Sequence, residues 1–119
     1  MSISSSSVEQ FFDRYASALL ARDARSIATM YAVPGLILFP GQTVVVSDPR
    51  QTEEFFAGSW DQYDGVDSID KSVSTMGATP STAWVNVTWT YAGRDQERFC
   101  YQLVDRPDGP QIAVLTLLT

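Results

Sequence analysis

The sequence has no histidine and a single cysteine, Cys100. Without histidine, a chain cannot build a serine–histidine triad, a histidine general base or most kinds of zinc site. A lone cysteine excludes an internal disulfide, which suits a reducing cytoplasm. The chemistry left to this chain is therefore that of carboxylates, tyrosine, the thiol and arginine.

Long apolar runs and clustered basic residues are also lacking. No window approaches the roughly 18 uninterrupted apolar residues that a membrane span requires, so no membrane partner is expected. The basic residues are scattered and the net charge is −6, so we expect no nucleic-acid partner. The segment MSISSSS has neither the basic region nor the apolar stretch of a signal peptide. These features predict a cytoplasmic protein with a polar tail at residues 1–5.

The chain does contain enough apolar material for one core. Apolar residues make up 45% of the sequence and charged residues 18%, which is typical of a globular protein. A length of 119 residues favours a single domain, 1–119. The acidic run Asp61, Asp64, Asp67 and Asp70 lacks the glycine and the final glutamate of an EF-hand loop. We therefore predict neither a metal site nor a cofactor.

Helical periodicity dominates the first 31 residues. From Ser6 to Ala21, apolar side chains recur at spacings of three and four, which predicts an amphipathic helix. Asp23 can cap a second, shorter helix that continues to about Tyr31. Val33-Pro34-Gly35 is expected to end this second helix.

Two short strands and a third helix are predicted next. Leu36 to Phe39 and Val44 to Val46 are runs of strand-forming residues separated by a Pro-Gly-Gln turn. In the stretch SDPRQTEEFFAGSW, Asp48 can cap a helix whose first position suits Pro49.

Beyond residue 65 the apolar pattern changes to a period of two. Candidate strands lie at 68–76, 82–91, 97–104 and 111–118, and short turn-rich segments join them. Consecutive strands with short links predict an antiparallel sheet. Helices first and strands afterwards predict an α+β architecture, with the helices packed on one face of a curved sheet.

The predicted sheet has more apolar surface than these helices can cover. The strand over 84–91 has large apolar residues at odd positions, yet Trp84 lies at an even one. The strand over 112–118 is apolar on both faces. Because the helices can pack on only one face of the sheet, the apolar residues of the other face must be buried by something else. We expect a homodimer that buries the outer sheet face.

This order of elements resembles the nuclear-transport-factor-two-like superfamily, a cystatin-like cone fold that includes ketosteroid isomerases, polyketide cyclases and scytalone dehydratase. The resemblance covers nearly the whole chain and is carried by FFDRYASALLARDARSIATMYA, GLILFP, EEFFAGSW and the terminal strands. It implies a curved, mainly antiparallel sheet wrapped around the N-terminal helices, enclosing a mostly apolar pocket. Many members of the superfamily pair through the outer sheet face, which agrees with the predicted dimer.

The resemblance also identifies positions where an isomerase would carry its chemistry. A ketosteroid isomerase uses a helix-one tyrosine, an aspartate base before the proline of the first strand, and a protonated aspartate in a later strand. Tyr15 is similar to the first of these, Phe39 before Pro40 falls on the second, and Cys100 falls near the third. Phenylalanine cannot move a proton, and a neutral thiol is a poor hydrogen-bond donor. Isomerisation by that route is therefore not expected, although the pocket keeps its shape.

Candidate site residues are mostly aromatic, because the aromatic set exceeds what a small core needs. Tyr15 is the candidate catalytic residue, as an oxyanion donor; the alternative is a core tyrosine whose hydroxyl is bonded to a neighbour. Arg98 and Gln102 share a strand face with Cys100 and either grip a carboxylate or carbonyl or face solvent or a dimer partner. The predicted ligand-binding residues are Phe12, Tyr31, Phe39, Phe56, Trp60, Trp89, Arg98, Cys100 and Gln102.

Two classes of function stay open at this point. One is a protein that binds a small apolar, aromatic or polycyclic molecule, with an isomerase, cyclase or dehydratase assisted by Tyr15 as its catalytic form. The other is a dimerisation or interaction module whose pocket is filled by its own side chains. Cys100 is a reactive thiol if Arg98 lowers its pKa, and otherwise an inert buried residue. An open cavity with Tyr15 at its wall favours the first class.

Overall fold

The computed structural model describes residues 4–63, 65–66, 68–91 and 96–118, without the side chains of residues 5, 62 and 63. Asp64 and Asp67 of the acidic run, the link at 92–95 and residues 1–3 of the predicted tail lie outside this range. The elements in chain order are α1 (Ser5–Leu20), α2 (Ala24–Thr29), β1 (Tyr31–Phe39), β2 (Gln42–Val46), α3 (Pro49–Ala57), the 3-10 helix η1 (Trp60–Tyr63), β3 (Ile69–Ala78), β4 (Thr82–Tyr91), β5 (Glu97–Arg106) and β6 (Gly109–Leu117).

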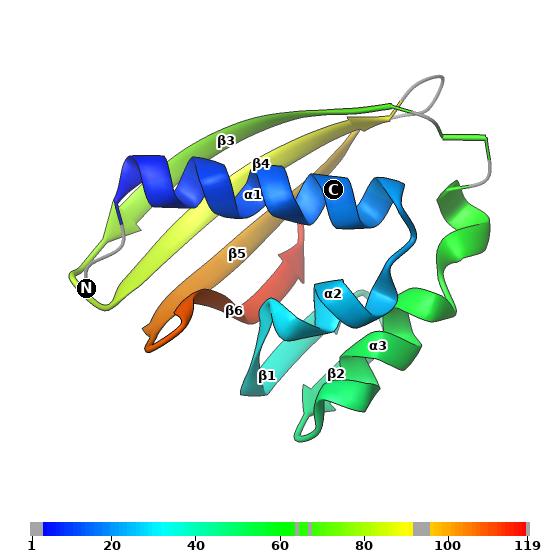
Figure 1. The fold of residues 1–119 in the computed structure, drawn as a ribbon, viewed down its shortest axis with the longest axis horizontal. Helices are drawn as coiled ribbons and strands as arrows, with labels where there is room; N and C mark the ends of the chain where they lie inside the picture. Colours follow the sequence, from blue (N-terminus) through cyan, green and yellow to red (C-terminus); the bar gives the residue numbers. More distant parts are fainter. Residues whose placement is uncertain (1–3, 64, 67, 92–95, 119) are drawn as a thin grey trace.

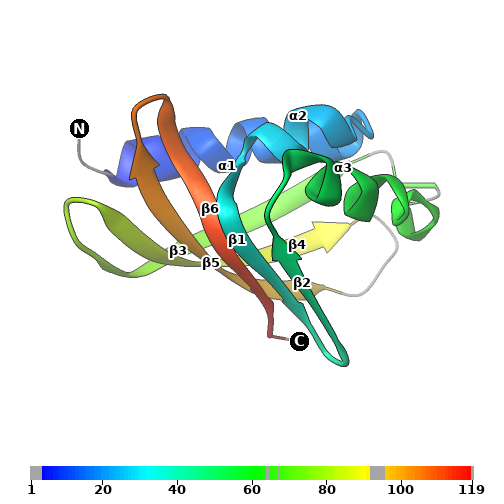
Figure 2. The same cartoon turned by 90° about the horizontal axis from the view of Figure 1, so that it is seen from below.

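The strands form one six-stranded sheet in the order β2-β1-β6-β5-β4-β3. Every neighbouring pair is antiparallel except β1 and β6, which run parallel. Figure 1 shows α1 crossing in front of the long strands, with α2 and α3 in front of β1 and β2. In the perpendicular view of Figure 2, the three helices lie together on one side of the curved sheet. The predicted α+β cone fold is confirmed.

Side-chain caps fix where the helices begin. Ser4 accepts a hydrogen bond from the backbone N–H of Ser7, so α1 begins at Ser5, one residue before its predicted start and inside the predicted tail. Asp48 caps α3 and forms a capping box with Gln51, whose side-chain oxygen accepts from the Asp48 N–H at 2.9 Å. Among the described residues, no helix is long and apolar enough to cross a membrane.

The second helix is shorter than the sequence predicts. It ends at Thr29, and Tyr31 already belongs to β1. Val33-Pro34-Gly35 therefore lies inside a strand and does not end a helix. The pairing of β1 with β6 shifts register between Tyr31 and Leu36, because proline has no N–H to donate to the ladder. Pro34 does interrupt regular structure, but the structure that it interrupts is a strand and not a helix.

The core lies between the helices and the inner face of the sheet. On β4 the odd-numbered residues are buried, among them Val85 and Val87, and the even-numbered residues are partly exposed. Their antiparallel partners on β5 are Tyr101 and Phe99, which are buried as well. Side chains alternate between the two faces of a strand, so this register decides which residues of β5 can reach the helices.

Candidate ligand-binding cavity

A cavity of about 550 Å³ lies between the helices and the inner sheet face. Its walls come from α1, the turn between β1 and β2, α3 with the residues after it, and strands β4, β5 and β6. Pockets for small molecules usually measure roughly 300–1,000 Å³. The space is therefore large enough for a compact ring system.

The deep wall of the cavity is aromatic and carries buried polar atoms. Tyr15, Trp89 and Tyr101 line it and are each at most 2% exposed. The indole N–H of Trp89 donates a hydrogen bond to the hydroxyl oxygen of Tyr101 at 2.9 Å. The ring of Tyr15 lies 5.8 Å from that of Trp89 and 5.9 Å from that of Tyr101, centroid to centroid. These three side chains therefore pack against one another in the cavity wall.

A second polar contact holds Tyr15 from the other side. Its hydroxyl lies 2.7 Å from the hydroxyl of Tyr31, and either group can be the donor. Tyr31 itself packs behind the wall, with its ring 5.6 Å from that of Phe56. Because a buried hydroxyl is costly without a partner, this contact fixes the rotamer of Tyr15. The Tyr15 hydroxyl is thus held in place at the cavity wall.

Phenylalanine rings surround the mouth of the cavity. Phe39 stacks on Phe55 at 5.4 Å and meets Phe99 edge to face at 6.0 Å. Pro40 and Gln42, which are exposed, continue the rim. Phe39 stands where the resemblance placed a catalytic base, and in this structure it supplies a ring to the mouth.

The structure brings four of the predicted site residues to the cavity lining: Tyr15, Phe39, Phe56 and Trp89. Phe12 does not line it but packs against Tyr101 at 4.9 Å between ring centroids. The predicted residues Tyr31 and Trp60 are also absent from the lining; Trp60 is half-buried against the core.

Three predicted ligand-binding residues lie on the opposite face of the sheet. Arg98, Cys100 and Gln102 alternate along β5 with the inward-facing Phe99 and Tyr101, and the cavity lining includes only the latter two. Adjacent residues of a strand point to opposite faces of the sheet, so residues one position away from Phe99 and Tyr101 face away from the cavity. Arg98, Cys100 and Gln102 therefore do not line this cavity, and a role for them in binding stays a prediction.

Cys100 also lacks the environment of a reactive thiol. Burial raises the pKa of the Cys100 thiol above its ordinary value. A raised pKa keeps the thiol protonated at neutral pH, and the protonated form is a poor nucleophile. Of the two roles considered for this residue, the inert one fits the structure.

Twelve of the sixteen described residues that line the cavity were not among the predicted site residues, and two of the twelve bring polar groups to the cavity from β5. Tyr101 and Glu97 both face the cavity from β5, and neither was among the predicted site residues. The signal was present in the alternation of Glu97, Phe99, Tyr101 and Leu103, a single strand face with three large apolar groups. Glu97 is the only acidic or basic side chain among the described residues that line this cavity.

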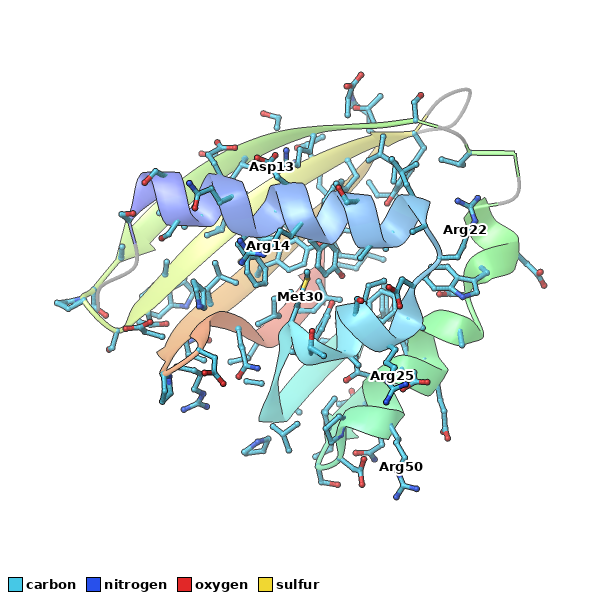
Figure 3. All side chains as sticks on the ribbon, in the orientation of Figure 1. Asp13, Arg14, Arg22, Arg25, Met30 and Arg50 are labelled. Carbon is cyan, nitrogen blue, oxygen red and sulfur yellow. The ribbon has the colours of Figure 1, made fainter. Side chains whose placement is uncertain are left out.

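A second hollow of about 470 Å³ lies on the surface between α1 and α2. Asp13, Arg14 and Met30, labelled in Figure 3, belong to its rim. Asp13 and Arg14 are exposed, and no aromatic side chain lines this hollow in the described part of the chain. It is also more open to solvent than the cavity between the helices and the sheet, so it encloses a small molecule less well.

The match to a family model decides the classification. The model described as "NTF2-like protein (DUF6841)" matches residues 5–116, which run from the start of α1 almost to the end of β6. The chain belongs to this NTF2-like family. The resemblance read from the order of helices and strands is thereby confirmed.

Several solved structures share the NTF2-like fold with this chain. Aln2 from a Streptomyces species has a TM-score of 0.72 at 15% identity, over 99% of this chain and 94% of that one. A protein provisionally assigned as a scytalone dehydratase from Novosphingobium aromaticivorans has a TM-score of 0.69 at 10% identity, over 93% and 80%. A domain with a cystatin-like fold from Nostoc punctiforme has a TM-score of 0.66 at 15% identity, over 96% and 77%. No curated protein matches the sequence significantly.

Proposed function

We propose that this NTF2-like protein binds a small, mostly apolar ring compound in the cavity between its helices and its sheet. The observation that carries the proposal is a cavity of about 550 Å³ with aromatic walls and hydrogen-bonding groups held at its deep end. Small-molecule sites combine such apolar walls with a few fixed polar groups. Within the cavity, we expect the hydroxyls of Tyr15 and Tyr101 to share their hydrogen bonding with a carbonyl or hydroxyl of the bound compound.

The cavity favours binding over the alternative of a module filled by its own side chains. Large aromatic residues do converge on this region, yet they leave the space open. Binding is also favoured over isomerisation, since Phe39 occupies the position that the resemblance gives to the catalytic base. Tyr15 is therefore proposed as a hydrogen-bonding residue for the bound compound.

The proposal can be tested by filling the cavity. Calorimetric titration with 2-naphthylmethanol, a neutral aromatic alcohol, is expected to show one binding site per chain. Leu117→Trp places a large ring in the lining and should abolish the binding. Gln10→Trp adds the same ring to an exposed position of α1 and serves as the matched control.

The polar contacts of the probe are tested with Tyr15→Phe. Loss of one hydrogen bond to a neutral partner is expected to weaken the binding of 2-naphthylmethanol by about threefold to tenfold. Equal affinity in wild type and Leu117→Trp would place the probe outside the cavity. Absence of binding by 2-naphthylmethanol and related bicyclic probes would contradict the proposed function.

We also propose that two copies of the chain pair through the outer sheet face. One row of side chains crosses this face in register, from Val45 through Leu36, Val114 and Gln102 to Trp84. The row is apolar apart from Gln102; Val45 is 61% exposed and Trp84 is 37% exposed, and exposed apolar side chains of this kind are typical of an interface. In the described part of the chain, no helix covers this face (Figure 2).

A further inference from the structure

Glu97 supplies the one charged side chain among the described residues that line the aromatic cavity. It is half-buried and faces the cavity at the start of β5, directly opposite Trp89 in the antiparallel register. Among the described residues, the Glu97 carboxylate has no hydrogen-bond or ion-pair partner. The neighbouring Arg98 cannot serve as one, because it lies on the other face of the sheet. In the described part of the chain, no side chain therefore competes with a bound molecule for this carboxylate.

No cationic side chain of the described chain lines this cavity, and Lys71, which shares the sheet face in register with Trp89, is paired with Asp13. Arg14, Arg22, Arg25 and Arg50 are on or between the helices, as Figure 3 shows, and none of them lines the cavity. The whole chain carries a net charge of −6, so the field around it attracts cations. An anionic compound would meet the Glu97 carboxylate with no compensating positive charge in the described lining.

Aromatic faces next to a carboxylate are the arrangement that recognises an ammonium group. Trp89 is the cross-strand partner of Glu97, and Phe99 is the next residue on the same face of β5. Phe39 lies 6.0 Å from Phe99, centroid to centroid, and continues the aromatic wall. Aromatic rings attract a cation through their negative faces, and a carboxylate adds a charge-assisted hydrogen bond to an N–H donor.

We propose that the compound bound by this protein is an aromatic amine in its protonated form, whose ring system fills the cavity and whose ammonium group meets Glu97. This inference rests on the proposed function, because it concerns the same cavity. It adds the charge of the bound compound, and it assigns Glu97 as the residue that selects for that charge.

The test compares three probes of one shape that differ in charge. Calorimetric titrations use 2-naphthylmethylamine, which is protonated at neutral pH, neutral 2-naphthylmethanol and anionic 2-naphthoate. Wild type is expected to bind the amine about tenfold more tightly than the alcohol, and the naphthoate most weakly. Glu97→Gln should lower the affinity for the amine to that for the alcohol and leave the affinity for the alcohol unchanged.

A matched variant separates the local charge from the overall charge. Glu54→Gln removes one negative charge from an exposed position of α3 outside the lining and should keep the preference for the amine. If both variants lose the preference equally, the overall charge causes it and the role of Glu97 is wrong. If wild type binds the alcohol and the amine equally, the inference fails while the proposed function stands. If none of the three probes binds, the proposed function fails and the inference fails with it.

Discussion

Trp89 donates its indole N–H to the hydroxyl oxygen of Tyr101 at 2.9 Å, in a part of the cavity wall where both side chains are at most 2% exposed. The two residues lie on neighbouring strands, so the contact ties β4 to β5 through side chains as well as through the backbone ladder. It also holds two aromatic planes at fixed positions in the wall. The shape and polarity of the deep wall therefore depend in part on this pair.

Replacing Tyr101 with phenylalanine should destabilise the fold. The Trp89 N–H would lose its acceptor without exposure to water, which costs about 1–3 kcal/mol of unfolding free energy. Denaturant unfolding followed by circular dichroism measures the change. Trp89→Phe and the double variant complete a cycle, in which the two substitutions should be clearly non-additive. Additive effects would show that the hydrogen bond contributes nothing of its own.

The second prediction concerns Gly35 in β1, which lies very close to two backbone carbonyl oxygens. A Cβ atom at Gly35 would lie 2.7 Å from the carbonyl oxygen of Ala32 and 3.0 Å from that of Ala113. Both neighbours are backbone atoms that cannot move aside easily, so Gly35→Ala should cost about 1–3 kcal/mol of unfolding free energy, as overpacking does. Gly77→Ala is the control, because nothing lies within 4 Å of a Cβ built there. Equal effects of the two substitutions in thermal or chemical unfolding would refute the steric explanation.

Much of this fold could be predicted from local sequence patterns. The caps at Asp23 and Asp48 begin their helices as expected, and the strands from β3 to β6 lie within a few residues of the period-two segments. Helix caps and strand periodicity depend on residues that are close together in the sequence. The parallel pairing of β1 with β6 depends on residues about 80 positions apart, such as Ile37 and Leu115, and no local pattern indicates it.

The site was predicted less completely than the fold, for a related reason. Tyr15, Phe56 and Trp89 were predicted because the chain has more aromatic residues than a small core needs and, for Tyr15, because of the family resemblance. On β5, a comparison with isomerases selected Cys100, whereas the alternation of large apolar residues, which was not used, indicates Phe99 and Tyr101. The alternation was the better guide, since side-chain direction follows strictly from strand geometry. Glu97 was missed because an acidic residue at the start of a strand looks like ordinary surface.

The thiol of Cys100 should react slowly with iodoacetamide. Burial raises the pKa of this thiol, so less thiolate is present at a given pH than for a free cysteine. The rate should increase with pH through the raised pKa, and mass spectrometry of the intact chain measures it.

A group with a raised pKa in the folded state stabilises the fold below its unfolded pKa, and this contribution is lost as the pH rises through the folded pKa. In the Cys100→Ser variant, the unfolding free energy should therefore decrease less steeply with alkaline pH than in wild type. If the Cys100 thiol of the wild type is alkylated as fast as glutathione at neutral pH, the buried environment assigned to it is wrong.

The outer sheet face provides the last prediction, which concerns pairing of two chains. Trp84→Glu places a charge at the end of the row that begins at Val45, where burial in an interface would leave the carboxylate unpaired. Sedimentation equilibrium should show a dimer for wild type and a monomer for this variant, with circular dichroism confirming that the variant is folded. Gln10→Glu adds the same charge to an exposed position of α1 and should remain a dimer. A monomeric wild type would overturn the proposed interface, and a dimeric Trp84→Glu would move the interface away from this face.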